Sequence, residues 1–258
     1  MPKQEKEQKS VLAEARAWAI RRKLFGAQAF LRYVILRFTE NLNQVSDDFV
    51  FKGGNLLWVY INTPRATIDL DLATLKTVSH KSVREVLERS CEQDVVIQYV
   101  LLSFKEVEHD GKSGAAATIG YTTEQGAKNR FEVDIVYAID TDSRKINSPI
   151  HASVKIRSAT LENIIADKLA ACQRFRSGNT RMKDFDDLWR LAGSKSEVNV
   201  ATLAKLLKRK DIAGRLDGAW INPELERAWR AHQDRYNDLP EKLGTVFETV
   251  NAWLVRVF

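Results

Sequence analysis

A short strand-like stretch that carries two aspartates constrains the fold of this chain more than any other feature. From Ile68 to Leu72, apolar and acidic residues alternate, which is the periodicity of a β-strand with one buried face. Asp69 and Asp71 are two residues apart, so both point to the other face. Neighbouring carboxylates repel each other unless a partner neutralises them, and a divalent cation such as Mg²⁺ prefers oxygen ligands of this kind. The alternative is the solvent face of a half-buried strand that happens to have this sequence.

A third carboxylate lies on a second predicted strand, residues 130–139. Phe131, Val133 and Ile135 occupy one face of this strand, and Asp134 occupies the other. If the strand lies beside residues 69–72, Asp134 completes a site of the kind that holds two metal ions roughly 3.5–4 Å apart for phosphoryl transfer. A solvated strand position is the alternative explanation of Asp134.

Two glycines precede the aspartate strand and indicate an anion site. Gly53, Gly54 and Asn55 follow the apolar residues 49–51 and begin what reads as a short helix. Backbone N–H groups at such a place can approach phosphate oxygens without a Cβ in the way, and the N-terminus of a helix favours anions. Two glycines alone indicate only a turn, but the order strand, glycines, helix and aspartate strand is far more specific.

Periodicity along the rest of the chain predicts an α+β fold. Residues 11–43 and 81–92 have the apolar spacing of helices, and residues 95–104, 115–123 and 130–139 read as strands. Further helices are expected at residues 160–176, 183–193, 200–209, 223–236 and 241–257. We therefore expect two lobes: N-terminal helices and an α/β core in residues 1–155, and a helical bundle domain in residues 156–258.

Composition and charge exclude several classes of protein. The formal net charge is +6, but residues 51–150 carry 12 basic and 14 acidic side chains, a net −2, between basic flanks. Such a distribution permits a polyanionic partner without demanding one. Cys91 and Cys172 are too few for a disulfide framework, and without a hydrophobic signal core at the start they suggest the cytoplasm. No apolar run is long enough to span a bilayer, and the four histidines lack the spacing of a zinc site.

Residues 51–72 carry the first of three motifs of a known family. The stretch FKGGNLLWVYINTPRATIDLDL resembles the first motif of the nucleotidyltransferase superfamily and, more narrowly, that of the AbiEii/AbiGii-type toxin nucleotidyltransferases. That family typically has Lys-Gly-Gly, an apolar helix, Arg, then Ser or Thr, and Asp-(Ile/Leu)-Asp. Asn55 stands where many members have Thr or Ser, and its amide can also donate to phosphate. The matching positions here are Lys52, Gly53, Gly54, Arg65, Thr67, Asp69 and Asp71.

The second motif, Lys-x-x-Ala, is present as residues 168–171. Lys168 lies in the middle of an apolar helix stripe, where a charged group needs a partner or a ligand. It could extend to the surface of the lobe or pair with Asp184. The resemblance favours a lysine that contacts nucleotide phosphates.

The third motif, Arg-x-Lys-Asp-x-x-Asp-Leu, is present as residues 181–188. The resemblance implies that Asp184 or Asp187, or both, orient Lys168 or line the nucleotide pocket. Lys183 and Asp187 are four residues apart and could instead pair across a helical turn, so a structural cluster of salt bridges is the alternative.

Together the three motifs imply a nucleotidyltransferase-type mixed sheet with flanking helices and a Mg²⁺-dependent enzyme, with Mn²⁺ as a second candidate metal. The enzyme would move a nucleoside monophosphate from a nucleoside triphosphate to an acceptor hydroxyl. Asp69, Asp71 and Asp134 would hold the metal ions, with Asp134 also placed to activate the acceptor. The expected nucleotide-binding residues are Lys52, Gly53, Gly54, Asn55, Arg65, Thr67, Lys168 and Lys183.

The resemblance also implies a biological role. It is that of the toxin in a toxin–antitoxin or phage-defence pair, with a cognate antitoxin and an RNA acceptor, such as tRNA, as partners. Arg174, Arg176 and Arg181 lie between the second and third motifs and are candidates for the acceptor surface, although basic clusters of this kind often form a solvated face. The alternatives are transfer to a small molecule or a protein, and a degenerate module that binds nucleotide without turnover.

Overall fold

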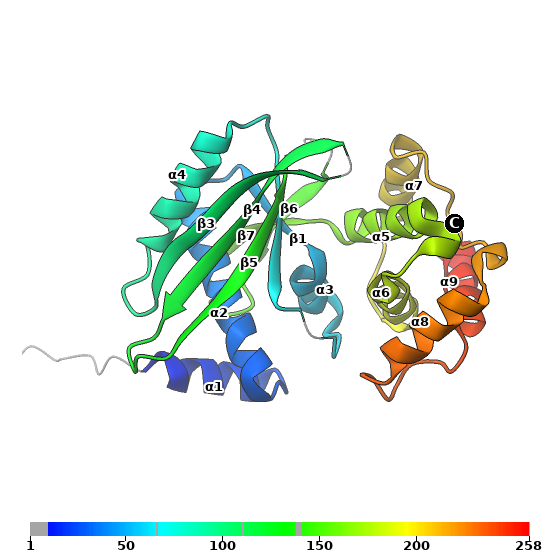
Figure 1. The fold of residues 1–258 in the computed structure, drawn as a ribbon, viewed down its shortest axis with the longest axis horizontal. Helices are drawn as coiled ribbons and strands as arrows, with labels where there is room; N and C mark the ends of the chain where they lie inside the picture. Colours follow the sequence, from blue (N-terminus) through cyan, green and yellow to red (C-terminus); the bar gives the residue numbers. More distant parts are fainter. Residues whose placement is uncertain (1–9, 66, 110, 138–140, 258) are drawn as a thin grey trace, which may run out of the picture. The chain divides into compact units, whose positions relative to one another are not determined.

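The computed structural model describes residues 10–65, 67–109, 111–137 and 141–257. Their strands form one mixed, seven-stranded sheet in the order β3-β4-β5-β2-β1-β7-β6 (Figure 1). β2 pairs in parallel with β5 and β1 with β7, whereas the other neighbours are antiparallel. The strands are β1 (Phe49–Lys52), β2 (Asp69–Thr74), β3 (Gln98–His109), β4 (Lys112–Thr122), β5 (Lys128–Val136), β6 (Ser143–Asn147) and β7 (Lys155–Ala159).

The chain divides into two compact units. Residues 1–56 and 66–159 make the first, which we call the sheet unit, and residues 57–65 and 160–258 make the second, the helical unit. The sequence predicted one boundary near residue 155. The division falls later because Lys155–Ala159 adds strand β7 to the sheet, and residues 57–65 belong with the helices although they lie early in the sequence.

Three helices of the sheet unit lie on one side of the sheet (Figure 1). α2 (Gly26–Val45) and α4 (His80–Cys91) pack against each other and against strands, and α1 (Val11–Arg21) packs on α2. The apolar stripe predicted for the N-terminal helix explains this arrangement, because it is the buried face of α2.

Aromatic side chains form the core between α2 and the sheet. The ring of Phe38 lies 5.2 Å from that of Tyr99 and 5.6 Å from that of Phe131, measured between centroids. The odd-numbered residues of β4 and β5 from Ala115 and Phe131 onward share this buried face. Their even-numbered neighbours, apart from two glycines, are half-buried or exposed on the other face, which we call the open face.

The helical unit agrees closely with the helices predicted from sequence. It contains α5 (Leu161–Phe175), α6 (Met182–Gly193), α7 (Val200–Arg209), α8 (Pro223–Gln233) and α9 (Leu243–Val257), with two short 3₁₀ turns at Arg176–Gly178 and Gly218–Trp220. The side chains of Thr160, Asn199 and Asn222 cap α5, α7 and α8 by accepting backbone N–H bonds. The predicted α+β class is confirmed.

Three local differences from the prediction have physical reasons. β3 continues to His109, beyond the predicted end at residue 104, because its polar end pairs with β4 in a hairpin. β6 has no apolar alternation in its sequence and is held as an edge strand by pairing with β7. β5 ends at Val136, and residues 138 and 139 of the predicted strand lie outside the described residues. Among the described helices, none combines the length and the apolar character that crossing a membrane requires.

Candidate active site

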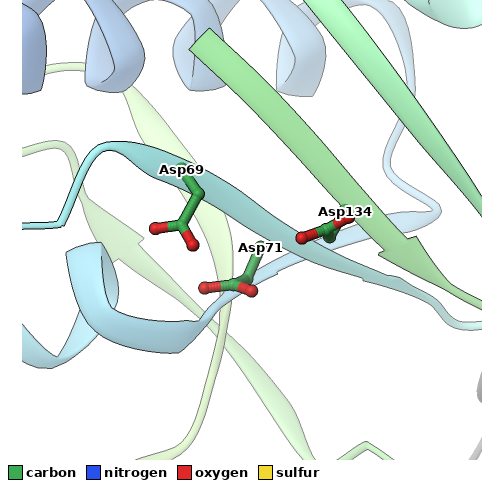
Figure 2. Close-up of side chains that lie close together, drawn as sticks. All are labelled: Asp69, Asp71 and Asp134. Atoms are coloured by element: carbon green, nitrogen blue, oxygen red, sulfur yellow. The ribbon is translucent and has the colours of Figure 1, made fainter. Parts of the chain in front are cut away.

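Three carboxylates meet on the open face of the sheet. Asp69 and Asp71 lie on β2 and Asp134 on the neighbouring β5, and one oxygen from each lies within 4.8 Å of the others (Figure 2). Asp71 and Asp134 are directly opposite each other in the parallel ladder. All three side chains are half-buried. The proximity expected from the two aspartate strands is therefore present in the structure.

The register that joins these carboxylates is fixed from the buried face. Leu70 and Leu72 of β2 and Val133 and Ile135 of β5 are all but fully buried under the helices. Because side chains alternate along a strand, a slip of one residue would bring both aspartates of β2 into the core. Three carboxylates this close repel one another, and hard divalent cations take oxygen ligands of this kind, so the set fits a metal ion.

Gly53 leaves the space that the Asp71 carboxylate occupies. It follows β1 and begins α3 (Gly53–Ile61), as the sequence predicted. Its φ angle is +71°, and a Cβ built on it would overlap the Asp71 carboxylate and lie 2.6 Å from the Asp71 Cβ. Both the backbone conformation and the lack of space therefore require glycine. The first N–H groups of α3 have no partners within the helix, which is the property of an anion site.

The side chain of Asn55, which the sequence predicted to contact phosphate, has a structural role within the sheet unit. Its side chain is almost completely buried, and both ends of the amide are bonded within the sheet unit. Nδ2 donates to the backbone carbonyl of Asp69 at 2.7 Å, and Oδ1 accepts from Nε of the buried Arg32 at 3.2 Å. The amide therefore ties helix α2 and the start of α3 to the first residue of the aspartate strand.

A second charged cluster is buried in the helical unit. Lys168 of α5 donates to Asp184 Oδ1 at 3.3 Å and to Asp187 Oδ2 at 2.5 Å, both on α6. Asp187 also accepts from Nε of Arg65 at 2.8 Å, and Asp184 accepts from Nε of Arg181 at 3.1 Å. Lys168, Arg65 and both aspartates are buried, so the ion pairs have little competition from water. Three cations therefore share these two carboxylates.

Mutual attraction keeps this cluster ionised. Burial disfavours the charge on Lys168, but Asp187 and Asp184 outweigh it and raise the pKa of the lysine above its ordinary value. Burial likewise disfavours the charge on Asp187, but Lys168 and Arg65 outweigh it and lower the pKa of this carboxyl. The pairing of Lys168 with Asp184, which the sequence left as an alternative, is present, and Asp187 joins it.

Comparison with known proteins identifies the family. The family model for the nucleotidyl transferase AbiEii toxin of a type IV toxin–antitoxin system matches residues 37–254. The chain belongs to the AbiEii family. The resemblance seen in the three motifs is thereby confirmed, and with it nucleotidyl transfer as the activity of this AbiEii protein. No curated protein sequence matches the chain.

Two solved structures support the fold. A proposed nucleotidyltransferase from H. pylori has 19% sequence identity and a TM-score of 0.54, with 90% of this chain and 96% of that chain covered. JHP933 from Helicobacter pylori has 17% identity and a TM-score of 0.56, with 90% and 93% covered. At these identities the likeness shows a shared fold, which agrees with the mixed sheet and helices of the AbiEii protein.

The remaining residues expected to bind nucleotide differ in burial: one is half-buried, one is buried and one is exposed. Lys52 is half-buried directly opposite Asp71 in the antiparallel ladder of β1 and β2. Thr67 is buried, and its hydroxyl has no hydrogen-bond partner among the described residues. Lys183 is exposed, and the Lys183–Asp187 pair considered from sequence does not form because Asp187 pairs with Lys168 and Arg65.

Of the three arginines expected at the acceptor surface, two are exposed and one pairs with a buried carboxylate. Arg174 and Arg176 are exposed at the end of α5, whereas Arg181 uses its guanidinium to hold Asp184. Arg181 is thus part of the buried cluster as well as of the surface, with its side chain half exposed.

The sequence did not reveal a network of ion pairs and hydrogen bonds that includes Asp186 of the third motif. Asp186 is fully buried and accepts from Arg190 Nε at 2.5 Å, and it is bonded to His232 Nε2 at 2.9 Å. Arg190 also donates to both carboxylate oxygens of Asp238. The spacing of Asp186 and Arg190, four residues apart on one helix, was the available signal. The network anchors α8 and the segment after it to α6.

Proposed function

We propose that this AbiEii protein uses Mg²⁺ to transfer a nucleoside monophosphate from a nucleoside triphosphate to a hydroxyl of an RNA acceptor. The observation that carries the proposal is the meeting of Asp69, Asp71 and Asp134 within 4.8 Å beside the glycines that begin α3. When bound there, a divalent cation supplies positive charge that neutralises the carboxylates and polarises the reacting phosphate. Mn²⁺ satisfies the same oxygen ligands and is the second candidate.

In this proposal the chain's own groups bind and orient the substrates. The backbone N–H groups at Gly53 and Gly54 bind phosphate oxygens, and Lys52 and Thr67 lie next to the same strand ends. Asp134 accepts the proton of the acceptor hydroxyl. The acceptor oxygen forms a bond to the α-phosphorus, the bond to the bridging oxygen breaks, and pyrophosphate leaves. Fixed charges account for most of the rate in such a transfer.

The buried cluster around Lys168 supplies positive charge in the proposal. Lys168 attracts the anionic triphosphate, and Asp184 and Asp187 keep it ionised. Arg65 contributes through the same carboxylate, Asp187. The exposed Lys183, Arg174 and Arg176 remain candidates for contacts with nucleotide or acceptor.

The test is incubation of the purified protein with each labelled nucleoside triphosphate, Mg²⁺ or Mn²⁺, and total RNA. Label in RNA is expected from the wild-type protein and none from Asp69→Asn. Label in the protein itself or in a small molecule would instead support those acceptors. Nucleotide binding without transfer to any acceptor would contradict the proposal and indicate a degenerate module.

The toxin role is proposed in the same terms. The type IV toxin–antitoxin family implies an antitoxin partner, and we propose that the cognate antitoxin opposes growth inhibition caused by nucleotidyl transfer, including during phage infection. Expression in a bacterial host is expected to stop growth, and co-expression of the neighbouring gene is expected to restore it. Continued growth arrest by Asp69→Asn would separate the toxicity from the transfer reaction.

A further inference from the structure

The outer strands of the sheet place cations on the same face as the three carboxylates. In the ladders, Lys105 of β3 lies opposite Ala116 of β4, Ala116 opposite Asp134 of β5, and Asp134 opposite Asp71. Side chains in one such row point to the same face. With strands about 4.8 Å apart, Lys105 lies about 10 Å from Asp134, measured along the row.

Two further cations lie along β5. Lys128 and Arg130 have the same parity as Asp134 and therefore share the open face. Arg130 is four residues from Asp134, about 13 Å along the strand. In the described part of the chain, Lys105, Lys128 and Arg130 are exposed and none is in an ion pair.

Charges on β3 are sorted by face. Glu106 lies opposite Ala115, whose side chain is buried under the helices, and its carboxylate lies 3.4 Å from His80 Nε2 of α4. Glu108 has the same parity as Glu106, whereas Lys105 points to the open face. The open face of the outer strands is therefore more basic than the strand sequences indicate. Besides Asp134, the acidic residue on this face of β5 is Glu132, which accepts a hydrogen bond from Thr118, which in turn accepts from Ser103.

The strand between these cations carries small side chains on the open face. The residues there are Ala116, Thr118 and Gly120 of β4. A Cβ on Gly120 would come within 2.9 Å of Leu102 and 3.1 Å of Val100, so both side chains lie across this glycine. Val100 and Leu102 are 51% and 55% exposed and form an apolar spot on which a base or a ribose can pack.

We infer that this surface, which we call the outer sheet face (Val100, Leu102, Lys105, Gly120, Lys128 and Arg130), binds the single-stranded end of the nucleic-acid acceptor and leads its terminal hydroxyl to Asp134. The inference rests on the proposed function and deepens it. Three unpaired cations around a floor of small residues suit a phosphate–ribose backbone. A docked protein would need a larger exposed apolar area than two side chains offer.

Replacing two of the cations tests the inference by binding alone. The double variant Lys105→Gln/Arg130→Gln is compared with Lys81→Gln/Arg89→Gln, which makes the same chemical changes at exposed positions of α4, on the covered side of the sheet. The affinity for a fluorescent single-stranded oligoribonucleotide is measured by anisotropy over a series of salt concentrations, without nucleoside triphosphate. Thermal unfolding of each variant verifies that it is folded.

The double variant on the sheet is expected to bind RNA about tenfold more weakly. The slope of log affinity against log salt should fall by about 1.4, the value for two single-strand phosphate contacts, and the α4 variant should match wild type. Unchanged RNA affinity and slope in the sheet variant would overturn the inference. If that variant instead lost binding of a protein partner, the surface would be a protein interface, which would also overturn it. The binding measurement needs no turnover, so it tests the surface independently of the reaction. If the sheet variant binds RNA more weakly but the wild-type protein transfers nothing to RNA, the proposed function is contradicted and the surface assignment stands.

Discussion

The side-chain amide of Asn55 donates a hydrogen bond to the backbone carbonyl of Asp69, with 2.7 Å between Nδ2 and O. The residue after the two glycines thus positions the first metal-ligand candidate through its backbone, and Arg32 holds the other end of the amide. The Asn55 side chain is almost completely buried and the contact is partly buried, so water replaces it only at a cost.

Removal of this amide should weaken both the fold and the site. Asn55→Ala leaves the partly buried Asp69 carbonyl without this donor, and we expect the free energy of unfolding to fall by about 1–3 kcal/mol. Affinity for Mn²⁺, measured by calorimetry, should fall as well because the start of β2 is released. Asn55→Thr, which carries a side chain common in the family at this place, is the control and should retain more of both properties. Equal metal affinity in Asn55→Ala and wild type would contradict a positioning role.

Neutralising one of the three carboxylates should raise stability while it removes activity. Asp71→Asn relieves repulsion among carboxylates whose oxygens lie within 4.8 Å of one another, so the melting temperature without metal is expected to rise. Added Mg²⁺ should stabilise the wild type by about 2.7 kcal/mol at a hundredfold excess over its Kd, and the variant much less. Nucleotidyl transfer should fall by about 10²-fold or more.

The matched control for this variant is Glu132→Gln, an acidic residue on β5 that lies opposite Asp69 but outside the cluster. It should keep the response to Mg²⁺. A metal-free melting temperature that falls in Asp71→Asn would show that the carboxylates do not repel one another as argued.

The sequence predicted most of the fold because its periodicities are strong, and it predicted the common face of two of the three carboxylates because of one short pattern. Asp69 and Asp71 alternate with leucines, so their common face followed from spacing alone. Their nearness to Asp134 required the pairing of β2 with β5, strands separated by two others in the sequence, and only the resemblance to a family supported it.

Other features of the site depend on contacts that no local pattern encodes. The role of Asn55 depends on Arg32, which comes from a helix 23 residues earlier. The partner of Arg65 is Asp187, 122 residues later in the chain. Lys168 on an apolar stripe signalled a buried charge, but its helix spacing could not distinguish a carboxylate partner from a phosphate ligand.

Gly53 should be far less tolerant of alanine than other glycines with the same backbone conformation. Gly53 and Gly26 have φ angles of +71° and +75°, and a Cβ at Gly26 meets no atom within 4 Å. Gly26→Ala should therefore cost only the left-handed backbone strain, about 1–2 kcal/mol. Gly53→Ala adds overlap with Asp71, so it should lose more stability and nearly all transfer activity. Urea unfolding and a transfer assay on both variants test this, and equal losses would contradict the steric argument.

The buried cluster in the helical unit should make stability depend on pH at both extremes. Asp187 has a lowered pKa, so its contribution is present above the ordinary carboxyl range and is lost as pH falls through the folded value. Lys168 has a raised pKa, so its contribution is present below the ordinary lysine range and is lost as pH rises through the folded value.

Lys168→Ala leaves two buried carboxylates without this cation and should cost about 3–5 kcal/mol at neutral pH. Asp187→Asn should flatten the acid side of the profile while Lys183→Gln, an exposed neighbour, leaves it unchanged. Urea unfolding between acidic and alkaline pH gives the profile, and an acid limb in Asp187→Asn as steep as that of wild type would show that this carboxylate does not carry the dependence.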